Sequence, residues 1–437
     1  MKPLEPALWA PWAWVDGRWQ QQVLLPIQPD GHWGAITSGV VQPPEGTRVL
    51  QGALLPSLVD AHSHAFQRAM AGLAEVREHA GDDDFWSWRE AMYGTALALD
   101  PVSLRRIATR LYRELLLGGY TQVVEFHYLH HAPDGQPYDD ELAMAWALAE
   151  AAQEVGIGLT LLPTLYAHRG FDEPGLRPEQ RRFATDADWV WRAQQRLQAA
   201  GLPLVNAGVA LHSLRAAHEA DIHALLAHVG DTECPIHIHV AEQTREVDDC
   251  VRRHGQRPIE WLSSHVPLDA RWQLVHATHA LPHEIEAVAT SGAGVVLCPS
   301  TEANLGDGFT DVPGWLEAGV PLSLGSDSQV GREWREELRW LEYGQRLRHR
   351  RRNVCAAPGS QPSTGARLFE AMRAGSGPTA GFAGWGLRPG ARADALLLDL
   401  ATADLDSLPC EQWLDALVFA SAGPLWSGVW VAGRQRD

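Results

Sequence analysis

The sequence predicts an α/β protein: a distorted (β/α)8 (TIM) barrel with a small β-sandwich domain formed by the N- and C-terminal segments. Two observations predict this fold. In the middle of the chain, short apolar runs alternate with helical stretches, which is typical of parallel βαβ units. At both ends, short β-like runs alternate with turn residues, which is typical of small antiparallel strands. The predicted boundaries are 1–55 and 381–437 for the sandwich and 56–380 for the barrel.

The β-like runs of the two terminal segments resemble each other in length and in the turn residues between them. They lie at residues 13–15, 23–27, 39–41 and 48–51 in the first segment and at 395–400, 413–419 and 428–432 in the last. Because the two ends show the same pattern, we expect them to pair into one small β domain.

Eight apolar runs between these segments predict the barrel strands. They lie at residues 54–59, 122–126, 158–162, 206–210, 235–240, 273–275, 294–297 and 321–324, and helical stretches such as 101–117 and 140–155 separate them. The segment 74–100, rich in tryptophan and acidic residues, is too long for a plain loop between a strand and a helix. We therefore expect it to lie over the mouth of the barrel.

The composition is that of an ordinary globular protein, with 45% apolar and 21% charged residues. No apolar run approaches the roughly 20 residues that a membrane span requires, and the first residues lack the continuous apolar segment of a signal peptide. A net charge of −18 argues against nucleic acid and anionic membranes as partners. The five scattered cysteines favour reduced thiols and a cytoplasmic protein.

Lysine is almost absent from the chain. Lys2 is the only lysine among the 36 basic residues, so arginine supplies the rest. This excludes an internal lysine as a Schiff-base nucleophile, and it also excludes a two-metal centre bridged by a carboxylated lysine.

Two histidines follow the first predicted barrel strand, in Asp60-Ala61-His62-Ser63-His64. Residues two apart face the same side of a strand about 6–7 Å from each other, so both imidazoles reach one metal ion only if the strand end bends. Histidines satisfied by backbone carbonyls are the alternative. The change from an apolar strand to a polar loop at this point favours the metal site.

His237 and His239 share one face of the fifth predicted strand. Only the residue nearer the C-terminal end reaches the mouth of a barrel, so His239 is the predicted ligand and His237 is expected deeper in the interior. Glu242 follows three residues later, where it can exchange protons with a metal-bound water as a general acid and base. The alternative is an ordinary glutamate in the first turn of the next helix.

Asp327 follows the last predicted strand and is either a metal ligand that takes the proton of the water or the cap of the next helix. With three imidazoles aimed at the mouth, the ligand is the simpler interpretation. His276, at the end of the sixth strand, is expected beside the bound hydroxide, and His279 is expected to be a satisfied loop histidine.

Several separated segments resemble the amidohydrolase superfamily, and in particular its mononuclear deaminase branch. They are DAHSHAFQRAM (60–70), FWSWR (85–89), EFHYLH (125–130), LHSLR (211–215) and ELRWLEYGQR (337–346), together with Glu242, His276 and Asp327. The resemblance covers the barrel from residue 54 to about residue 353. The terminal segments fit the superfamily's small sandwich domain less distinctively.

The resemblance implies one divalent metal ion, zinc, held by His62, His64, His239 and Asp327, although iron would fit the same donors. Glu242, His276 and Asp327 would be catalytic. The residues implied to bind the substrate are Gln67, Arg89, Tyr128, His212 and Arg215.

The implied reaction is the hydrolytic deimination of N-formimino-L-glutamate to N-formyl-L-glutamate and ammonia in histidine degradation. Zinc-bound hydroxide would attack the formimino carbon, since zinc lowers the pKa of bound water towards ~7. Arginine suits the two carboxylates of this small-molecule substrate because its guanidinium offers a bidentate fork. A homodimer is the expected assembly. One position departs from the family: Gln329 stands where histidine is frequent, and a substrate contact there would alter binding.

Two other functions stay open on the sequence. The first is a related deaminase that acts on a purine, a pterin or another aminated heterocycle, for which aromatic walls would replace the arginines. The second is a non-catalytic metal-binding scaffold, in which Glu242 and His276 would be dispensable packing residues.

Overall fold

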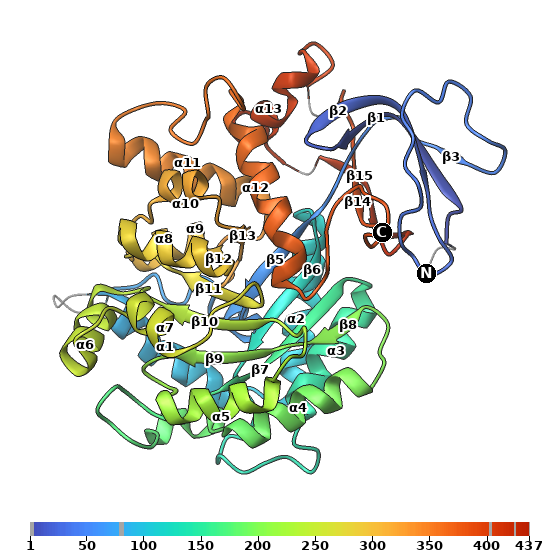
Figure 1. Ribbon diagram of the computed structural model, residues 1–437. Coiled ribbons are helices and arrows are strands. Elements are labelled where there is room, and N and C mark those ends of the chain that lie inside the picture. Colours follow the sequence, from blue (N-terminus) through green and yellow to red (C-terminus); the bar gives the residue numbers. More distant parts are fainter. Residues whose placement is uncertain (1–3, 78–82, 402–403, 424, 437) are drawn as a thin grey trace.

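The computed structural model describes residues 4–77, 83–401, 404–423 and 425–436. Lys2 and residues 78–82 of the predicted insertion lie outside the described residues. Figure 1 shows a barrel surrounded by helices and, to one side, a smaller β-structure in which N-terminal strands (blue) lie beside C-terminal strands (red).

Eight parallel strands close into a barrel, as the sequence predicts. The strand order is β5-β6-β7-β9-β10-β11-β12-β13, and β13 pairs with β5 to complete the ring. The strands are β5 (Leu58–Ser63), β6 (Tyr120–His127), β7 (Gly158–Leu165), β9 (Val209–Ser213), β10 (Ile236–Val240), β11 (Trp272–His276), β12 (Gly294–Leu297) and β13 (Leu322–Leu324). Almost every strand residue is buried, which explains the continuous apolar runs in the sequence.

Helices follow the strands around the outside of the barrel (Figure 1). They are α2 (Pro101–Leu117), α3 (Ala143–Val155), α4 (Ala187–Ala199), α5 (Glu219–Val229), α6 (Thr244–His254), α7 (Pro258–His265), α8 (Pro282–Ser291), α9 (Pro299–Leu305), α10 (Val312–Ala318), α11 (Trp334–His349) and α12 (Thr364–Thr379). The predicted insertion contains α1 (Phe85–Ala98), and Asp84 and Ser87 form a capping box at its start. Two 3-10 helices, η1 (Ala65–Met70) and η2 (Pro178–Phe183), lie in the loops.

The barrel has several irregularities, among them the ones at Gly208 and at the seam between β13 and β5. The predicted strand at 206–210 is divided at Gly208 into β8 (Val205–Ala207) and β9, and a Cβ atom at Gly208 would lie 2.6 Å from the Pro235 carbonyl oxygen. At the seam between β13 and β5, the strands share the pair Leu324 with Asp60, and an isolated parallel bridge joins Ser63 with Asp327. Side chains complete this seam, because Asp60 accepts hydrogen bonds from the backbone N–H (2.8 Å) and the hydroxyl (2.6 Å) of Ser326.

The two ends of the chain pair into one seven-stranded sheet. Its members are β1 (Ala7–Val15), β2 (Arg18–Pro26), β3 (Arg48–Val49), β4 (Ala53–Leu55), β14 (Ala395–Leu398), β15 (Trp426–Val431) and β16 (Arg434–Arg436). The N- and C-terminal segments meet where β4 pairs antiparallel with β14, and apolar side chains from both segments share one core. The exact domain boundaries stay a prediction.

Two predicted strands of the terminal segments are wrong. Residues 39–41 form no strand, and Val41 is 72% exposed, so no core stabilises an extended segment there. Trp413–Phe419 is helix α13, which follows the 3-10 helix η3 (Cys410–Gln412). Its buried residues Trp413, Leu414, Leu417 and Val418 have helical spacing, and so short an apolar run is compatible with either structure.

A buried ion pair joins the small sheet to the N-terminal end of the barrel. Arg392 donates from Nε and Nη2 to the two carboxylate oxygens of Asp394 (2.9 and 2.6 Å). The same guanidinium donates to Gln122 Oε1 (2.6 Å) and to the Thr121 carbonyl oxygen (3.0 Å) at the start of β6. Every edge of this cation therefore meets an acceptor supplied by the chain.

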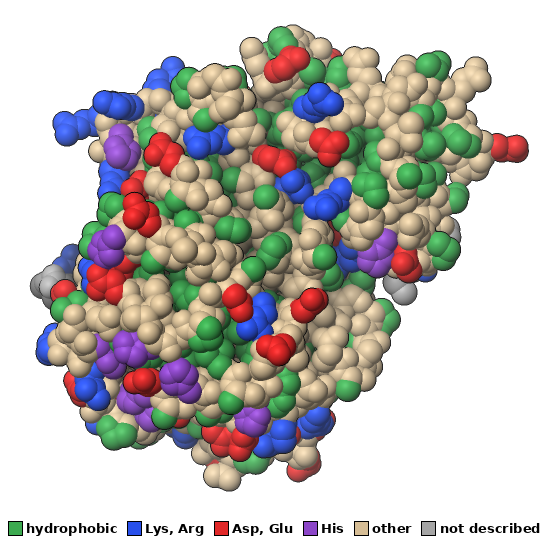
Figure 2. All heavy atoms as spheres, in the orientation of Figure 1, with side chains coloured by type: hydrophobic (Ala, Val, Ile, Leu, Met, Phe, Trp, Pro, Cys, Tyr) green, Lys and Arg blue, Asp and Glu red, His purple; other side chains and the backbone are tan. Residues whose placement is uncertain are grey.

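On the face drawn in Figure 2, acidic and basic side chains are interspersed over most of the surface. Among the described residues, no helix combines the length and the apolar character that a membrane span requires. The five cysteines are free thiols, three of them buried and two half-buried.

Candidate metal centre and active site

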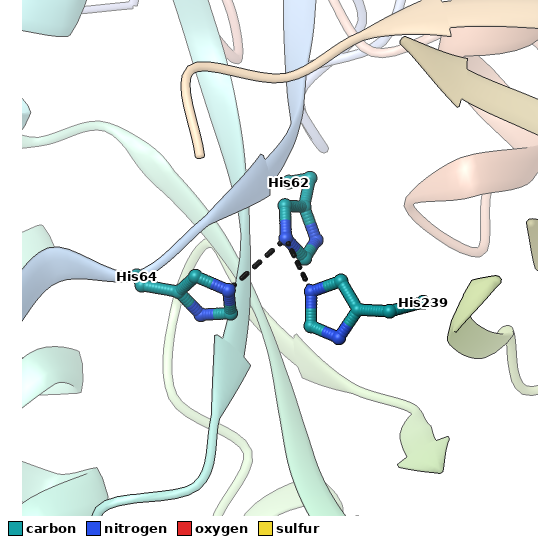
Figure 3. A group of neighbouring side chains, drawn as sticks. All are labelled: His62, His64 and His239. Atoms are coloured by element: carbon teal, nitrogen blue, oxygen red, sulfur yellow. Dashed lines mark hydrogen bonds between the residues drawn. The ribbon is translucent and has the colours of Figure 1, made fainter. Parts of the chain in front are cut away.

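Three imidazoles converge at the C-terminal end of the barrel (Figure 3). The Nε2 atom of His62 lies 3.1 Å from Nε2 of His64 and 3.0 Å from Nε2 of His239. The first two residues come from the end of β5 and the third from β10. His237 lies deeper, where its Nε2–H donates to the Thr379 carbonyl oxygen (2.9 Å), as the parity of the strand predicts.

The backbone fixes the protonation of two of these rings. Nδ1 of His64 lies 2.9 Å from the Phe126 carbonyl oxygen, and Nδ1 of His239 lies 2.8 Å from the His212 carbonyl oxygen. Because a carbonyl oxygen only accepts, both Nδ1 atoms carry the hydrogen. Burial lowers the pKa of both rings, so they are neutral and their Nε2 atoms present lone pairs to the cluster.

Asp327 adds a carboxylate to the cluster. Its Oδ1 atom lies 3.4 Å from Nε2 of both His62 and His64, and its Oδ2 atom lies 3.8 Å from Nε2 of His276. The residue follows β13 and reaches the cluster because the chain turns sharply there, with a φ of 48°. Asp327 is therefore placed to complete a set of three nitrogen donors and one oxygen donor.

The donor set fits a divalent metal ion. The Nε2 atoms of His62, His64 and His239 point at one small volume. A hydrogen on His62 Nε2 could bond to the Nε2 lone pair of His64 or to that of His239, but not to both. A cation at that point would satisfy all of them, and imidazole with carboxylate is a common ligand combination for zinc. Two overlapping groups have the spacing that a metal ion requires: His62 with His64 and His239, and His62 with His276 and Asp327.

His276 lies among three carboxylates. Its Nε2 atom is 3.7 Å from Glu242 Oε1, and its Nδ1 atom is 3.4 Å from Glu302 Oε1. Burial lowers the pKa of His276, but the carboxylates of Glu242, Glu302 and Asp327 outweigh it, and the net shift is upward. Burial also raises the pKa of Glu242 above its ordinary value. His276 and Glu242 can therefore hold a proton between them near neutral pH.

Left-handed backbone turns aim the side chains at the mouth. Ala241, His276, Ala277, Asp327 and Gln329 all have a positive φ, between 47° and 71°. Such conformations are unfavourable for residues with a Cβ atom and cluster at functional sites, where the surrounding structure holds them. Here Glu246 holds one of them, because its carboxylate accepts the backbone N–H groups of Ala241 (3.2 Å) and Glu242 (3.1 Å).

A second layer of buried polar side chains supports the metal cluster, and sequence reasoning missed most of it. Gln329 does not line the cavity; its Nε2 atom donates to the Asp327 carbonyl oxygen (2.9 Å) and to Ser63 Oγ (3.0 Å). The Ser63 hydroxyl donates in turn to Glu125 Oε2 (2.8 Å). These bonds join the ends of β5, β6 and β13. The glutamine at position 329, where the resembling family frequently has histidine, therefore supports the scaffold of the site and does not line the cavity.

A cavity opens above the imidazole cluster and encloses about 530 Å³ of empty space, part of it open to solvent. All five residues predicted to bind the substrate line it: Gln67, Arg89, Tyr128, His212 and Arg215. Further lining residues that the sequence did not single out are Met92, Tyr93, Tyr166, Phe183 and Leu305. Met92 and Tyr93 lie one helical turn after Trp88 and Arg89 on α1, so helical spacing could have marked them. Tyr166, Phe183 and Leu305 come from segments distant in sequence, and no local motif marks them.

Two arginines of the cavity have no carboxylate partner among the described residues. Nε of Arg89 and Nε of Arg215 are both buried without an acceptor. Burial lowers the pKa of Arg89, and the nearby charge of Arg215 lowers it further. Gln67 is similar, since its Nε2 atom donates to Tyr128 OH (3.0 Å) while its Oε1 atom lacks a donor in the described part of the chain. Around the cavity, the two arginine Nε–H groups are therefore unsatisfied donors and Gln67 Oε1 is an unsatisfied acceptor.

His279 lies outside the metal cluster, in the loop after β11. Its Nε2 atom is buried and has no hydrogen-bond partner among the described residues. The backbone of Asp307 and that of Glu242 nevertheless lie close enough to the ring to raise its pKa against the lowering by burial. The place of His279 in a loop is as predicted, and whether the ring is satisfied stays a prediction.

Comparison with known proteins agrees with this geometry. The profile of the amidohydrolase family matches residues 53–436. The chain belongs to the amidohydrolase family. This amidohydrolase is 45% identical to formimidoylglutamate deiminase of Pseudomonas aeruginosa, over 98% of this chain and 94% of that protein. It is also 25% identical to 5-methylthioadenosine/S-adenosylhomocysteine deaminase of Haloquadratum walsbyi, over 85% of this chain and 76% of the relative.

Solved structures support the fold. A crystal structure of an amidohydrolase from Brucella melitensis is 41% identical and superposes with a TM-score of 0.92, covering 98% of this chain and 94% of that one. The structure of an adenosine deaminase from Xanthomonas campestris with bound zinc has a TM-score of 0.79 at 21% identity. The superposition covers 99% of this chain and 93% of the chain of the adenosine deaminase. The second similarity is evidence for the fold alone.

Proposed function

We propose that this amidohydrolase hydrolyses N-formimino-L-glutamate to N-formyl-L-glutamate and ammonia in histidine degradation, with one zinc ion. The observation that carries the proposal is the pair of arginines, Arg89 and Arg215, which share one cavity with the imidazole cluster and lack a carboxylate partner among the described residues. A substrate with two carboxylates at one end and a formimino group at the other complements both parts of this cavity.

The relatives support the same assignment. The protein from Pseudomonas aeruginosa bears the name of a formimidoylglutamate deiminase, and its similarity extends over nearly the whole of both chains. The relatives named as purine-nucleoside deaminases are less similar. The free cysteines support a reducing compartment, the cytoplasm, as the site of the reaction.

His62, His64, His239 and Asp327 would hold the metal ion. When bound, it would polarise a water molecule and lower the pKa of that water towards ~7. The Nδ1–H bonds of His64 and His239 to backbone carbonyls keep their Nε2 lone pairs directed at the ion, which increases the basicity of the ligands.

The proton transfers fall to three side chains. Asp327 accepts a proton from the attacking water, while His276 donates a hydrogen bond to the water oxygen and stabilises the charge that develops there. Glu242, whose pKa burial raises, delivers a proton to the imino nitrogen of the substrate. As the bond between that nitrogen and the formimino carbon breaks, the nitrogen receives a second proton, the one that Asp327 took from the water, and leaves as ammonia. The carbon keeps the water oxygen as a formyl group, and the remaining proton of that oxygen passes to Glu242.

The test is the release of ammonia by the purified, zinc-loaded protein from formiminoglutamate, guanine and adenosine. We expect ammonia from formiminoglutamate alone, and a fall in rate of about 10²–10⁴-fold in the matched variant Glu242→Gln. Ammonia from guanine or adenosine, with none from formiminoglutamate, would establish the heterocycle deaminase instead. Ammonia from none of the three above the Glu242→Gln level would favour the metal-binding scaffold.

A further inference from the structure

Trp86 contacts three arginines that belong to three different segments. The guanidinium carbon of Arg89 lies 4.5 Å from the centre of its indole ring, that of Arg215 lies 5.5 Å away, and that of Arg245 lies 4.5 Å away. Arg89 lies on α1, Arg215 follows β9, and Arg245 lies in the first turn of α6. At these distances the π face of an indole attracts a cation.

We propose that Trp86 is a positioning residue that holds Arg89 and Arg215 at the spacing required by a dicarboxylate. This inference rests on the proposed function, because that function supplies the two carboxylates. Trp86 does not itself line the cavity, whereas Phe85, Trp88 and Arg89 of the same segment do. Any effect of Trp86 on the ligand is therefore transmitted through the arginines.

Electrostatics explains why such a residue is needed. Two guanidinium groups in one cavity repel each other. Glu242 and Glu246 interact with the charge of Arg215, but no described carboxylate forms a hydrogen-bonded ion pair with Arg89 or Arg215. The negative faces of aromatic rings replace that carboxylate: Arg89 lies over Trp86 and also over Tyr93, with 5.7 Å to the Tyr93 ring centre. A carboxylate at this point would neutralise the arginines and compete with the substrate, whereas an aromatic ring stabilises the cations and leaves their N–H groups free.

The position of Trp86 is fixed by its own helix. Asp84 accepts the backbone N–H groups of Trp86 (2.9 Å) and Ser87 (3.2 Å) at the start of α1. The ring of Phe85 packs edge-on against Trp86, with 5.1 Å between the ring centres. Since Arg245 follows Glu242 by three residues, Trp86 also connects the insertion to the segment that carries this proposed proton donor.

The test measures binding as well as activity. Glutarate, which carries two carboxylates and no formimino group, is titrated by calorimetry into the zinc-loaded wild type and into Trp86→Leu and Trp86→Phe. We expect the glutarate Kd and the KM for formiminoglutamate to rise about ten-fold in the leucine variant and about three-fold in the phenylalanine variant, which keeps a smaller π face. The kcat should stay within about three-fold, because the metal cluster is untouched.

Three controls separate positioning from a general structural role. Trp146→Leu, on α3 and remote from the cavity, should leave the glutarate Kd unchanged. Butyrate, with one carboxylate, should lose less affinity than glutarate in Trp86→Leu. In the background of Arg215→Met, the Trp86 substitution should have a smaller effect than alone, since the two residues act together.

The inference is overturned if wild type and Trp86→Leu bind glutarate equally, or if wild type does not bind it. If the leucine variant does not fold, Trp86→Phe decides, and an unchanged glutarate Kd overturns the inference. The proposed function has a separate criterion, the release of ammonia by wild type, so the two can fail independently.

Discussion

Arg392 and Arg215 are two buried arginines at opposite ends of the same barrel. Arg392, at the N-terminal end, is 8% exposed, and Arg215, at the mouth, is 7% exposed. The first is paired with Asp394 and hydrogen-bonded on every edge. The second has a buried Nε atom without an acceptor and no carboxylate partner among the described residues.

The difference shows how stability and function are separated in this fold. A buried charge is tolerated only when something compensates it. At the N-terminal end the chain supplies the compensation, and the result is a joint between the barrel and the small sheet. At the mouth, aromatic rings compensate part of the positive charge of the arginines, and the carboxylates of the proposed substrate compensate the remainder. We therefore expect a substitution of Arg392 to lower the stability of the protein and a substitution of Arg215 to lower its activity.

The largest effect is expected on stability, from Arg392→Met. The substitution leaves Asp394 buried without its cation, so the free energy of unfolding should fall by about 3–5 kcal/mol. Denaturant unfolding measures the loss, and the kcat/KM of the protein that remains folded should match wild type. The double variant with Asp394→Asn should recover part of the stability. An unfolding free energy equal to that of wild type would show that the ion pair does not hold the joint.

Arg215→Met is the matched substitution at the mouth. Loss of a charged hydrogen-bonding partner of a carboxylate costs about 2–5 kcal/mol, so kcat/KM for formiminoglutamate should fall by about 30- to 5,000-fold. The melting temperature should be unchanged or higher, because no described residue loses an ion-pair partner. Steady-state kinetics and calorimetry check both parts. Full activity in this variant would remove Arg215 from the proposed anchors.

The imidazole cluster of His62, His64 and His239 also needs a partner that the chain does not supply, which is the proposed metal ion. Chelation of the metal should lower the free energy of unfolding by the binding free energy, about 3 kcal/mol when free zinc is 100 times its Kd. Calorimetry of chelated and zinc-restored protein measures this difference. The variant His239→Ala should show little dependence on zinc. Equal melting temperatures with and without zinc in the wild type would contradict a metal centre at these residues.

Glu337 is a buried carboxyl group that lacks an ion-pair partner among the described residues. Burial raises its pKa to about 8, although the N–H and hydroxyl of Ser300 donate to it. The unfolded chain loses this proton near pH 4.3. Between that pH and about 8 the folded protein keeps the proton, so stability falls as pH rises, by up to about 1.4 kcal/mol per pH unit.

Unfolding of Glu337→Gln at pH 5 and pH 8 tests this pH dependence. The glutamine variant should lose less stability than wild type between these two values, because glutamine carries no proton to release. The same loss in both proteins would mean that Glu337 is ionised in the fold.

The sequence predicted the barrel and the convergence of the three imidazoles because both depend on local signals. Each strand is buried on both faces and reads as a continuous apolar run, and each candidate ligand lies in the last residues of a strand or up to three residues beyond it. The helix Trp413–Phe419 was mistaken for a strand because seven residues are too few to reveal a period. The division at Gly208 arises from contact with Pro235, which no local pattern records.

The supporting residues of the site could not be predicted for the same reason. Glu302 contacts His276, Glu246 holds the turn at Glu242, and Gln329 joins two strand ends. Each is an unremarkable polar residue in the sequence, and its role depends on which strand lies beside it in the barrel. The five implied substrate residues were placed correctly around the cavity, but their chemical roles stay predictions.

The most direct measurement is a crystal structure of the zinc-loaded Glu242→Gln variant with formiminoglutamate bound. The account predicts the formimino carbon beside the ion held by the three imidazoles and Asp327, with the two carboxylates on Arg89 and Arg215. A substrate whose carboxylates point to solvent, with both guanidinium groups left without a partner, would contradict it.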